Sequence, residues 1–310
     1  DKVAADDAPG GHTPLVNDFA NRGLPCHDVV VGRERERRDR PRTMTFYAMG
    51  VNQGSHVSRV DDRRLRVDPI RDRRLAEYLE KQDVRYLLAA QMPNGCWPQV
   101  YPLQGSYHDA ITFNDDASVN ALRILESVVK GDHEFVPAAV ADSARIGITR
   151  ATECILRTQV SINGFKTVWG AQHDPLTWQP VSARAYEHAS LSGRESAAIL
   201  DLLMRIPSPS DSVQGAVHAA AAWFKANAIN GYSYTFRGGL TADSRAGPIW
   251  ARFYELGTNR PIFSDRDGIV RYNLSEVGEE RRRGYGWYTD EPVSTLRRYD
   301  GWARNHPIKN

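Results

Sequence analysis

The segment AAQMPNGCW, residues 89–97, ends a helical pattern with an Asn-Gly dipeptide that an aromatic residue follows closely. The same order of signals recurs in RTQVSINGF (157–165) and KANAINGYSY (225–234), and the three dipeptides lie 69 and 67 residues apart. Asn-Gly is a typical signal for a helix end and a turn, although it can also recur by chance. A near-constant period that accommodates two helices indicates stacked helical hairpins. We therefore predict an alpha/alpha toroid, in which such hairpins form a ring and their loops line a substrate cleft.

Apolar residues at helical spacing predict five helices, over residues 75–91, 117–130, 138–159, 192–205 and 211–229. Alternation typical of strands is scarce, and residues 235–239 predict no more than a short hairpin arm. Beyond Leu240 the chain is dense in Gly, Pro and aromatic residues, which predicts long ordered loops followed by helices at 275–283 and 292–303. The prediction is a mainly α protein with a single domain over residues 1–310, of which residues 1–74 are hard to interpret.

The composition suits one globular domain. The chain has 310 residues, 41% of them hydrophobic, and a net charge of +2. No run approaches the ~20 apolar residues of a membrane span, so we predict no membrane partner. Residues 34–74 are rich in Arg, but acids alternate with them, which favours a solvated surface over nucleic-acid binding. Cys26, Cys96 and Cys154 are an odd set without metal-binding spacing, which argues against a disulfide scaffold or a zinc site.

Asp115 and Asp116 stand side by side in TFNDDASVNALRIL (112–125), where a helical pattern begins. The simpler interpretation is capping by Asn114 or Asp115, because Asn and Asp often start helices and acids favour the positive end of the helix dipole. The alternative is a metal site. Consecutive helical residues point about 100° apart, so at most one of the two carboxylates should bind an ion directly.

A second segment, VWGAQHDPLTWQPVSARAYEHASLSGRES (168–196), joins His173 and Asp174 to two tryptophans and to Arg184. One histidine beside one aspartate is weak evidence of a metal site, and a hydrogen-bonded structural histidine is the alternative. For Arg184 the alternative to a functional role is an ion pair with Glu187 or another acid. The residues alone leave these alternatives open.

Three segments in order resemble the pectate lyases of polysaccharide lyase family 10: PNGCWPQVYPLQGSYHDAITFNDDA (93–117), residues 168–196 quoted above, and WARFYELGTNRPIFSDRDG (250–268). The resemblance implies an alpha/alpha toroid that cleaves polygalacturonate by calcium-assisted anti β-elimination, with an arginine as the base. Polygalacturonate is then the expected partner and Ca²⁺ the cofactor. We expect a secreted monomer whose signal peptide has been removed.

The resemblance also assigns roles to particular residues. A calcium-binding aspartate of the family falls on Asp115 or, with a shift of one residue, on Asp116. The arginine base falls on Arg184. The arginine of the RDG motif, which binds the substrate carboxylate, falls on Arg266.

One position departs from the family pattern. The segment VNQGSHVSRV (51–60) places Asn52 where the family has an aspartate that is important for activity and calcium. We therefore expect Asn52 to be a weaker metal ligand that lowers calcium affinity. His173, Asp174 and Trp97 complete the predicted substrate-binding residues, and core packing is the alternative for Trp97.

The residue types suit a lyase. Removal of the C5 proton of galacturonate, alpha to a carboxylate, builds an enolate-like dianion that calcium and arginine can neutralise. Because arginine is normally always charged, the base role requires that burial near calcium and Arg266 lower the pKa of Arg184. Two alternatives remain. One is a toroid glycoside hydrolase with Asp174 and Asp115 as acid and base, and the other is a non-catalytic or weakened pectate-binding relative.

Overall fold

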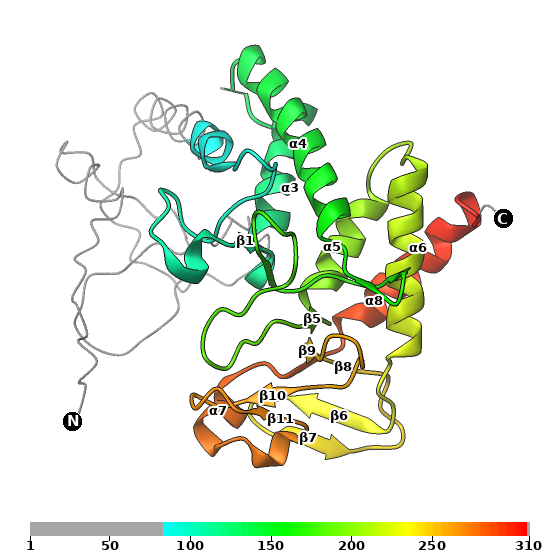
Figure 1. Ribbon diagram of the computed structural model, residues 1–310. Helices are drawn as coiled ribbons and strands as arrows, with labels where there is room; N and C mark the ends of the chain where they lie inside the picture. The colour runs from blue at the N-terminus through cyan, green and yellow to red at the C-terminus, as the bar shows by residue number, and fades with distance from the viewer. Residues whose placement is uncertain (1–82, 135, 309–310) are drawn as a thin grey trace, which may run out of the picture.

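The computed structural model describes residues 83–134 and 136–308, so Asn52, Cys26 and the predicted region 1–74 lie outside the described residues. Residues 83–90 are helical, and six further α-helices follow in the described part: α3 (Ala117–Lys130), α4 (Ala138–Thr158), α5 (Glu195–Met204), α6 (Asp211–Ala226), α7 (Glu279–Gly284) and α8 (Glu291–Asn305). Figure 1 shows α3, α4, α5, α6 and α8 in one half of the molecule, and α7 among strands in the other.

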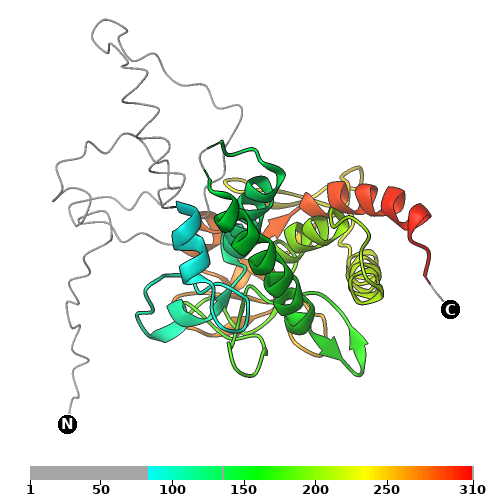
Figure 2. The same ribbon diagram turned by 90° about the horizontal axis from the view of Figure 1, so that it is seen from above.

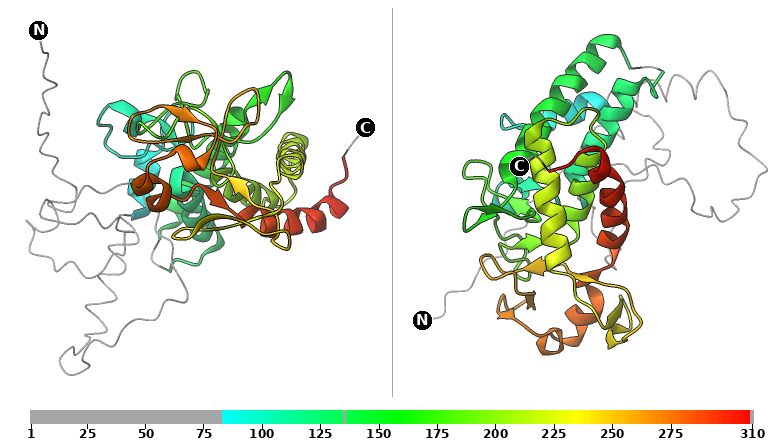
Figure 3. Two further views of the ribbon diagram at one scale, coloured as in Figure 1. Left: turned by 90° about the horizontal axis from the view of Figure 1, so that it is seen from below. Right: turned by 90° about the vertical axis from the view of Figure 1, so that its right-hand side faces the viewer.

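The apolar pattern placed most helices close to where they form. α3 and α4 pack side by side (Figure 2), and α5 packs against both α6 and α8. α6 and α8 also run next to each other (Figure 3). Local signals explain the ends: Ser210 caps α6 by accepting from Val213 N–H, and α3 stops at Gly131, whose φ of 85° suits glycine. The predicted helix over 275–283 is instead a 3₁₀ turn, η3 (Leu274–Glu276), followed by α7.

Twelve short strands accompany these helices and form six antiparallel two-stranded sheets in the described residues. The pairs are β1 (Ile111–Thr112) with β4 (Gln172–His173), β2 (Ser161–Ile162) with β3 (Phe165–Lys166), β5 (Leu191–Ser192) with β9 (Phe253–Tyr254), β6 (Tyr232–Thr235) with β7 (Gly239–Ala242), β8 (Trp250–Ala251) with β12 (Tyr288–Thr289), and β10 (Phe263–Ser264) with β11 (Val270–Arg271).

These strands overturn the predicted fold class. The described structure mixes helices with many short strands and does not form the mainly α alpha/alpha toroid that the sequence predicted. Most of the strands are two residues long, too short to carry an alternating pattern. The period of the Asn-Gly dipeptides indicated repeated units, but it could not specify how those units pack together.

The Asn-Gly dipeptides are turns, although not all of them end helices. Gly95 follows the first helix with φ 93°, and a Cβ there would lie 2.3 Å from the Arg150 carbonyl oxygen. Asn163 and Gly164, with φ 53° and 83°, form the turn of the β2–β3 hairpin, since α4 has already ended. Two positive φ angles are what a tight hairpin turn requires. Gly231, with φ 82°, comes directly before β6.

A tryptophan after each of these turns fixes a loop to the helix before it. In each case the indole N–H donates to a helix carbonyl: Trp97 to Leu87 (2.8 Å), Trp169 to Ile155 (2.7 Å) and Trp250 to Phe224 (2.9 Å). All three indoles are fully buried, so each donor needs such a partner. The recurrence in the sequence therefore reflects a repeated unit of helix and loop.

The last two tryptophans begin loops of the same construction, the first tryptophan loop (169–180) and the second tryptophan loop (250–261). In each loop, the backbone N–H of the residue after Trp donates to the side chain of the fifth loop residue. Gly170 donates to His173 and Ala251 donates to Tyr254, both at 2.9 Å. His173 and Tyr254 each form a β-bridge to the proline that ends the loop. Through β1–β4, β5–β9 and β8–β12, the loops pair with the strands that precede α3, α5 and α8.

Two hydrophobic cores meet at the second tryptophan loop. The main core comes from the helices and includes Ala251, while the smaller core of the strand-rich half includes Phe253 and Trp287. Arg252 therefore stands between the two cores. Figure 1 places β5, β8 and β9 between the helical and strand-rich halves, and β1 higher, beside the helices.

A disulfide joins Cys96 in the loop after the first helix to Cys154 in α4, with a Cα–Cα distance of 5.8 Å. One bridge is not a disulfide scaffold, but the odd cysteine count gave no sign of it. Within the described stretch of the chain, none of the helices is both long enough and apolar enough to span a bilayer.

Candidate active site

Asp115 and Asp116 lie in a strained turn directly before α3. They belong to the 3₁₀ turn η2 (Asn114–Asp116), and both are left-handed, with φ 50° and 62°. Asp116 is the N-cap of α3, but its side chain makes no capping hydrogen bond. Two successive left-handed non-glycine residues carry a conformational cost, which often marks a functional site. The predicted capping by Asn114 or Asp115 is wrong, because Asp116 is the N-cap and no side chain caps the helix. The 100° argument does not apply, because the pair lies outside a regular helix.

The Asp115 carboxylate is held by two arginines. Its Oδ1 accepts from Arg194 Nη1 at 3.0 Å and from Arg252 Nη2 at 3.2 Å, while Oδ2 accepts from Asn114 Nδ2 at 3.0 Å. Burial alone would raise the pKa of Asp115, but Arg252 and Arg194 outweigh it and lower the pKa below the ordinary value. Asp115 is therefore ionised at neutral pH.

Arg252 ties the start of α3 to the start of α5. This buried guanidinium donates from Nη2 to Asn114 Oδ1 (2.9 Å), to Asp115 and to Glu195 Oε1 (2.8 Å). Glu195 is itself fully buried and also accepts from the Ser192 hydroxyl. Burial would lower the pKa of Arg252, but Glu195 leads a set of neighbours that raise it well above the usual range. Arg252 is therefore a permanent buried cation. Its charge is balanced by Asp115 of η2 and Glu195 of α5.

Asp116 is in the opposite situation. Burial, reinforced by the nearby Glu195 charge, raises its pKa from 3.8 to about 6. Among the described residues, its buried Oδ1 has no hydrogen-bond partner. Glu291 at the start of α8 adds a third acid, which also lies 3.5 Å from Arg194. The starts of three helices thus gather negative charge that their arginines neutralise only in part.

A single oxygen of this arrangement suits a hard cation, because Arg194, Arg252 and Asn114 already occupy the Asp115 carboxylate. Calcium prefers oxygen ligands, and Asp116 Oδ1 is a buried oxygen that a cation would satisfy. In the part of the chain that the structure describes, no group of three or more His, Cys, Asp or Glu side chains is placed to hold a metal. A bound ion would thus need further oxygens from outside this group, such as substrate or water.

Arg184 is paired with Glu187, as the alternative from the sequence anticipated. Its Nε and Nη2 donate to the two Glu187 oxygens at 2.9 and 2.7 Å, and its guanidinium lies 5.1 Å from the Tyr186 ring centre. Tyr285 Oη also donates to Glu187, at 2.6 Å. Burial favours a lower pKa for Arg184, but the Glu187 hydrogen bonds and charge raise it above the ordinary value. The expected lowering of this pKa is therefore wrong for this structure, because a carboxylate outweighs burial.

These side chains line an open cavity of about 390 Å³ between the two halves of the molecule. Its lining comes from segments far apart in the sequence: Asp115, Arg184, Arg194, Phe236, Arg252, Gly284, Tyr285 and Gly286. Three arginines and the Asp115 carboxylate line the cavity, and Arg194 and Arg252 both contact Asp115. A guanidinium binds a carboxylate in a planar, two-bond geometry, so arginine is a suitable residue type for a ligand that carries carboxylates.

Comparisons with known proteins show which family the chain belongs to. The sequence profile of the pectic acid lyases matches residues 73–296. The chain belongs to the pectic acid lyase family. Among solved structures, the family 10 polysaccharide lyase from Cellvibrio cellulosa is 34% identical, with a TM-score of 0.70 over 73% of this chain and 73% of that one. An aspartate-to-alanine variant of that lyase, in complex with trigalacturonic acid, is also 34% identical, with a TM-score of 0.69 over 75% of this chain and 74% of the other. None of the curated proteins matches the chain.

Family membership confirms the resemblance, but the structure gathers only some of the predicted site residues. Asp115 and Arg184 line the cavity, and Asp116 follows Asp115 in the sequence. Arg266 does not line it: its side chain is 66% exposed and donates twice to Glu280, at 3.1 Å each. Its role in binding substrate stays a prediction.

His173, Asp174 and Trp97 belong to the scaffold in this structure. His173 is fully buried, accepts from Gly170 N–H and donates to the Trp178 carbonyl at 2.7 Å; burial lowers its pKa to about 4. Asp174 accepts from two backbone N–H groups of its own turn. Trp97 is 0% exposed. Core packing leaves His173 and Trp97 without exposed surface for a substrate, while the Asp174 carboxylate is used in hydrogen bonds of its own turn. The substrate-binding role of Asp174 stays a prediction.

Besides two lining glycines, the sequence interpretation missed four cavity residues: Arg194, Arg252, Phe236 and Tyr285. Arg194 and Arg252 stand inside the quoted segments SGRES and WARFYELGTNRP, so a signal was present. These two arginines were missed because the sequence does not show the acids that pair with them, and an arginine without a known partner is usually a surface residue. Phe236 and Tyr285 lie outside the three segments, and only the fold brings them to the cavity.

Proposed function

We propose that this member of the pectic acid lyases is a pectate lyase, which cleaves polygalacturonate by β-elimination. The observation that carries the proposal is one open cavity that Arg184, Arg194, Arg252 and Asp115 line together. Polygalacturonate presents a carboxylate on every sugar, so a cavity with several guanidinium groups matches its charge. The relative from Cellvibrio cellulosa that was solved with trigalacturonic acid supports the same substrate class.

In the proposed reaction the cavity arginines bind uronate carboxylates and stabilise negative charge that develops at C5. The base removes the C5 proton, the C5–H electron pair forms the C4–C5 double bond, and the C4–O bond breaks. The leaving oxygen takes a proton and becomes the new hydroxyl end. Asp115 and Asp116 would hold calcium, which, when bound, supplies further neutralisation of the uronate carboxylate.

Arg184 is our candidate for the base. To act so, it must give up the proton that Glu187 helps it to retain, because that carboxylate raises its pKa. The neutral guanidine is rare at pH 7 and becomes less rare as pH rises. Turnover should therefore increase toward alkaline pH, and binding of substrate should not follow the same trend.

The pairing of Arg184 with Glu187 also supports a second candidate, a pectate-binding relative with weak or no turnover. An arginine held as a cation by two hydrogen bonds can bind a uronate without acting as a base. The third candidate, a glycoside hydrolase using Asp174 and Asp115, has less support. Asp174 does not line the cavity, and its carboxylate is used within its own turn.

Incubation with polygalacturonate and calcium separates these candidates. Ultraviolet absorbance from a conjugated double bond in the product identifies a lyase. New reducing ends without that absorbance identify a hydrolase, and retention of the protein by immobilised polygalacturonate with neither product identifies a binder. A chelator should abolish the lyase reaction and added calcium should restore it. Full turnover by the metal-free protein would contradict the calcium assignment.

We also propose that the protein is secreted and acts as a monomer. A polysaccharide substrate is met outside the cell, and the Cys96–Cys154 disulfide is of a kind that persists in oxidising compartments. Light scattering on the purified protein tests the oligomeric state. A stable dimer would contradict the second part of this proposal.

A further inference from the structure

Phe236 is an aromatic side chain that the structure leaves exposed at a charged cavity. It is 54% exposed, belongs to neither hydrophobic core of the described residues, and lines the cavity together with Arg184, Arg194 and Arg252. It stands at the tip of the hairpin formed by β6 and β7. More than half of this large apolar residue is left exposed, so its role is sought in what the cavity binds.

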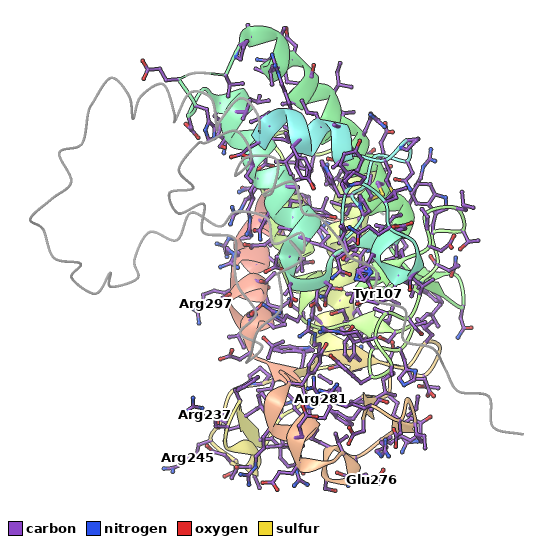
Figure 4. All side chains as sticks on the ribbon, turned by 90° about the vertical axis from the view of Figure 1, so that its left-hand side faces the viewer. Tyr107, Arg237, Arg245, Glu276, Arg281 and Arg297 are labelled. Carbon is purple, nitrogen blue, oxygen red and sulfur yellow. A yellow bond between two sulfur atoms is a disulfide. The ribbon has the colours of Figure 1, made fainter. Side chains whose placement is uncertain are left out.

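The hairpin tip is held in one shape. Thr235 and Gly239 form the last pair of the two strands, and Thr235 Oγ1 accepts from Gly238 N–H at 3.0 Å across the turn. Gly239 has φ 74°, which a glycine adopts readily. Figure 4 shows the neighbouring Arg237 at the outer edge of the molecule, beside the part that carries Arg281 of α7. Phe236 is thus presented by an ordered turn.

The hairpin is also tied to the cavity wall. Tyr234 Oη donates to the Tyr285 carbonyl at 2.9 Å and accepts from Trp287 N–H at 3.2 Å. The same cavity is lined by Gly284, Tyr285 and Gly286, the segment that directly precedes Trp287. Tyr234 and Leu240 pack against the smaller core. The position of Phe236 at the rim is therefore fixed by both hydrogen bonds and packing.

We propose that Phe236 is a stacking platform for one sugar ring of polygalacturonate, and this inference rests on the function proposed above. A galacturonate ring has an apolar face of C–H groups and a carboxylate at its edge. Aromatic rings bury large apolar surfaces with a defined geometry, while the arginines across the cavity take the carboxylates. Phe236 would fix which face of the sugar turns toward the arginines, as a positioning residue outside the reacting atoms.

The test compares Phe236→Ala and Phe236→Trp with a matched control, Phe165→Ala. Phe165 is also an exposed aromatic in a hairpin, 77% exposed in β3, but it does not line the cavity. Each variant is measured for its melting temperature, its retention by immobilised polygalacturonate, and its kcat and KM. Loss of a stacking contact that is equal in ground and transition states raises KM and leaves kcat unchanged.

Phe236→Ala should raise KM and weaken retention by about three- to tenfold, the effect of one aromatic contact, with melting unchanged. Phe236→Trp should restore both, and Phe165→Ala should match the wild type. Equal KM and retention in the Phe236→Ala and Phe165→Ala proteins would overturn the stacking role while leaving the proposed lyase intact. If the wild type itself neither cleaves nor binds polygalacturonate, the proposed function fails and the stacking role fails with it.

Discussion

The two tryptophan loops share a backbone and differ in charge. Residues 169–180 and 250–261 repeat the same tryptophan anchor, the same hydrogen bond to the fifth residue and the same bridge to the closing proline. At the third position the first loop has Ala171 and the second has Arg252. The difference shows that the repeated loop is a scaffold. The buried cation of the cavity comes from the single residue, Arg252, at the third position of the second loop.

The largest effect should come from removing that cation. Arg252→Ala would remove the buried cation that contacts both Glu195 and Asp115 at the junction of the two cores. Breaking a buried ion pair from one side costs about 3–5 kcal/mol. Chemical denaturation should show this loss of unfolding free energy. Arg266→Ala, which removes an exposed arginine from a pair with Glu280, should leave the denaturation midpoint unchanged. Equal effects of the two variants would contradict the special position of Arg252.

A second comparison sharpens the equivalence of the loops. His173→Phe and Tyr254→Phe each remove the acceptor of a buried backbone N–H, from Gly170 and Ala251 respectively. An unsatisfied buried donor costs about 1–3 kcal/mol, so both variants should lose a similar amount of stability at pH 8. Clearly unequal losses would indicate that the two loops are not held in the same way.

The stabilities of the His173→Phe and Tyr254→Phe variants should depend differently on pH below 6.5. His173 has a pKa of about 4 in the folded protein and an ordinary value of 6.5, so below pH 6.5 the unfolded chain binds a proton that the folded chain does not. The wild type therefore loses stability as pH falls from 6.5 toward 4. Tyr254→Phe should retain this slope and His173→Phe should lack it. Asp116 contributes a slope of the opposite sign, but equally in both variants. Identical pH profiles would show that His173 is not buried as a neutral side chain.

A smaller effect, of opposite sign, is expected at the start of α3. Asp116 has a pKa of about 6 against an ordinary 3.8, so its charge opposes folding increasingly as pH rises through this range. In metal-free protein at pH 8, Asp116→Asn should increase the unfolding free energy by about 1–2 kcal/mol, whereas Asp115→Asn should decrease it. Calcium should raise the melting temperature of the wild type but not of Asp116→Asn. A destabilised, calcium-responsive Asp116→Asn protein would remove Asp116 from the proposed metal site.

Local sequence signals were sufficient for much of the fold. Periodic apolar residues located α3, α4 and α6 to within a few residues at each end, because each of these helices buries one face. The Asn-Gly dipeptides located turns and revealed the repeated unit. Short strands such as β1 and β5 could not be predicted, since pairing with a distant loop, and not a local pattern, makes them extended. The toroid prediction failed for the same reason.

For the site too, contacts between neighbours in the sequence could be predicted, and contacts between distant segments could not. Arg184 and Glu187 are three residues apart, so their ion pair was foreseeable, and Asp115 was singled out by its neighbour and its motif. The contacts of Arg252 were not foreseeable, because its partners Asn114 and Glu195 lie 138 and 57 residues away in the chain. Family resemblance named Arg266 as a ligand for substrate, while the structure places it on the surface with Glu280.

The central claim, that the arginine-lined cavity carries out β-elimination on polygalacturonate, is tested most directly by following ultraviolet absorbance with wild-type and Arg184→Ala proteins under saturating calcium. The account predicts steady formation of the unsaturated product by the wild type, faster at alkaline pH, and none by Arg184→Ala. Arg184→Ala should still be retained by immobilised polygalacturonate through Arg194 and Arg252. Near-normal kcat in Arg184→Ala, or reducing ends without absorbance in the wild type, would contradict it.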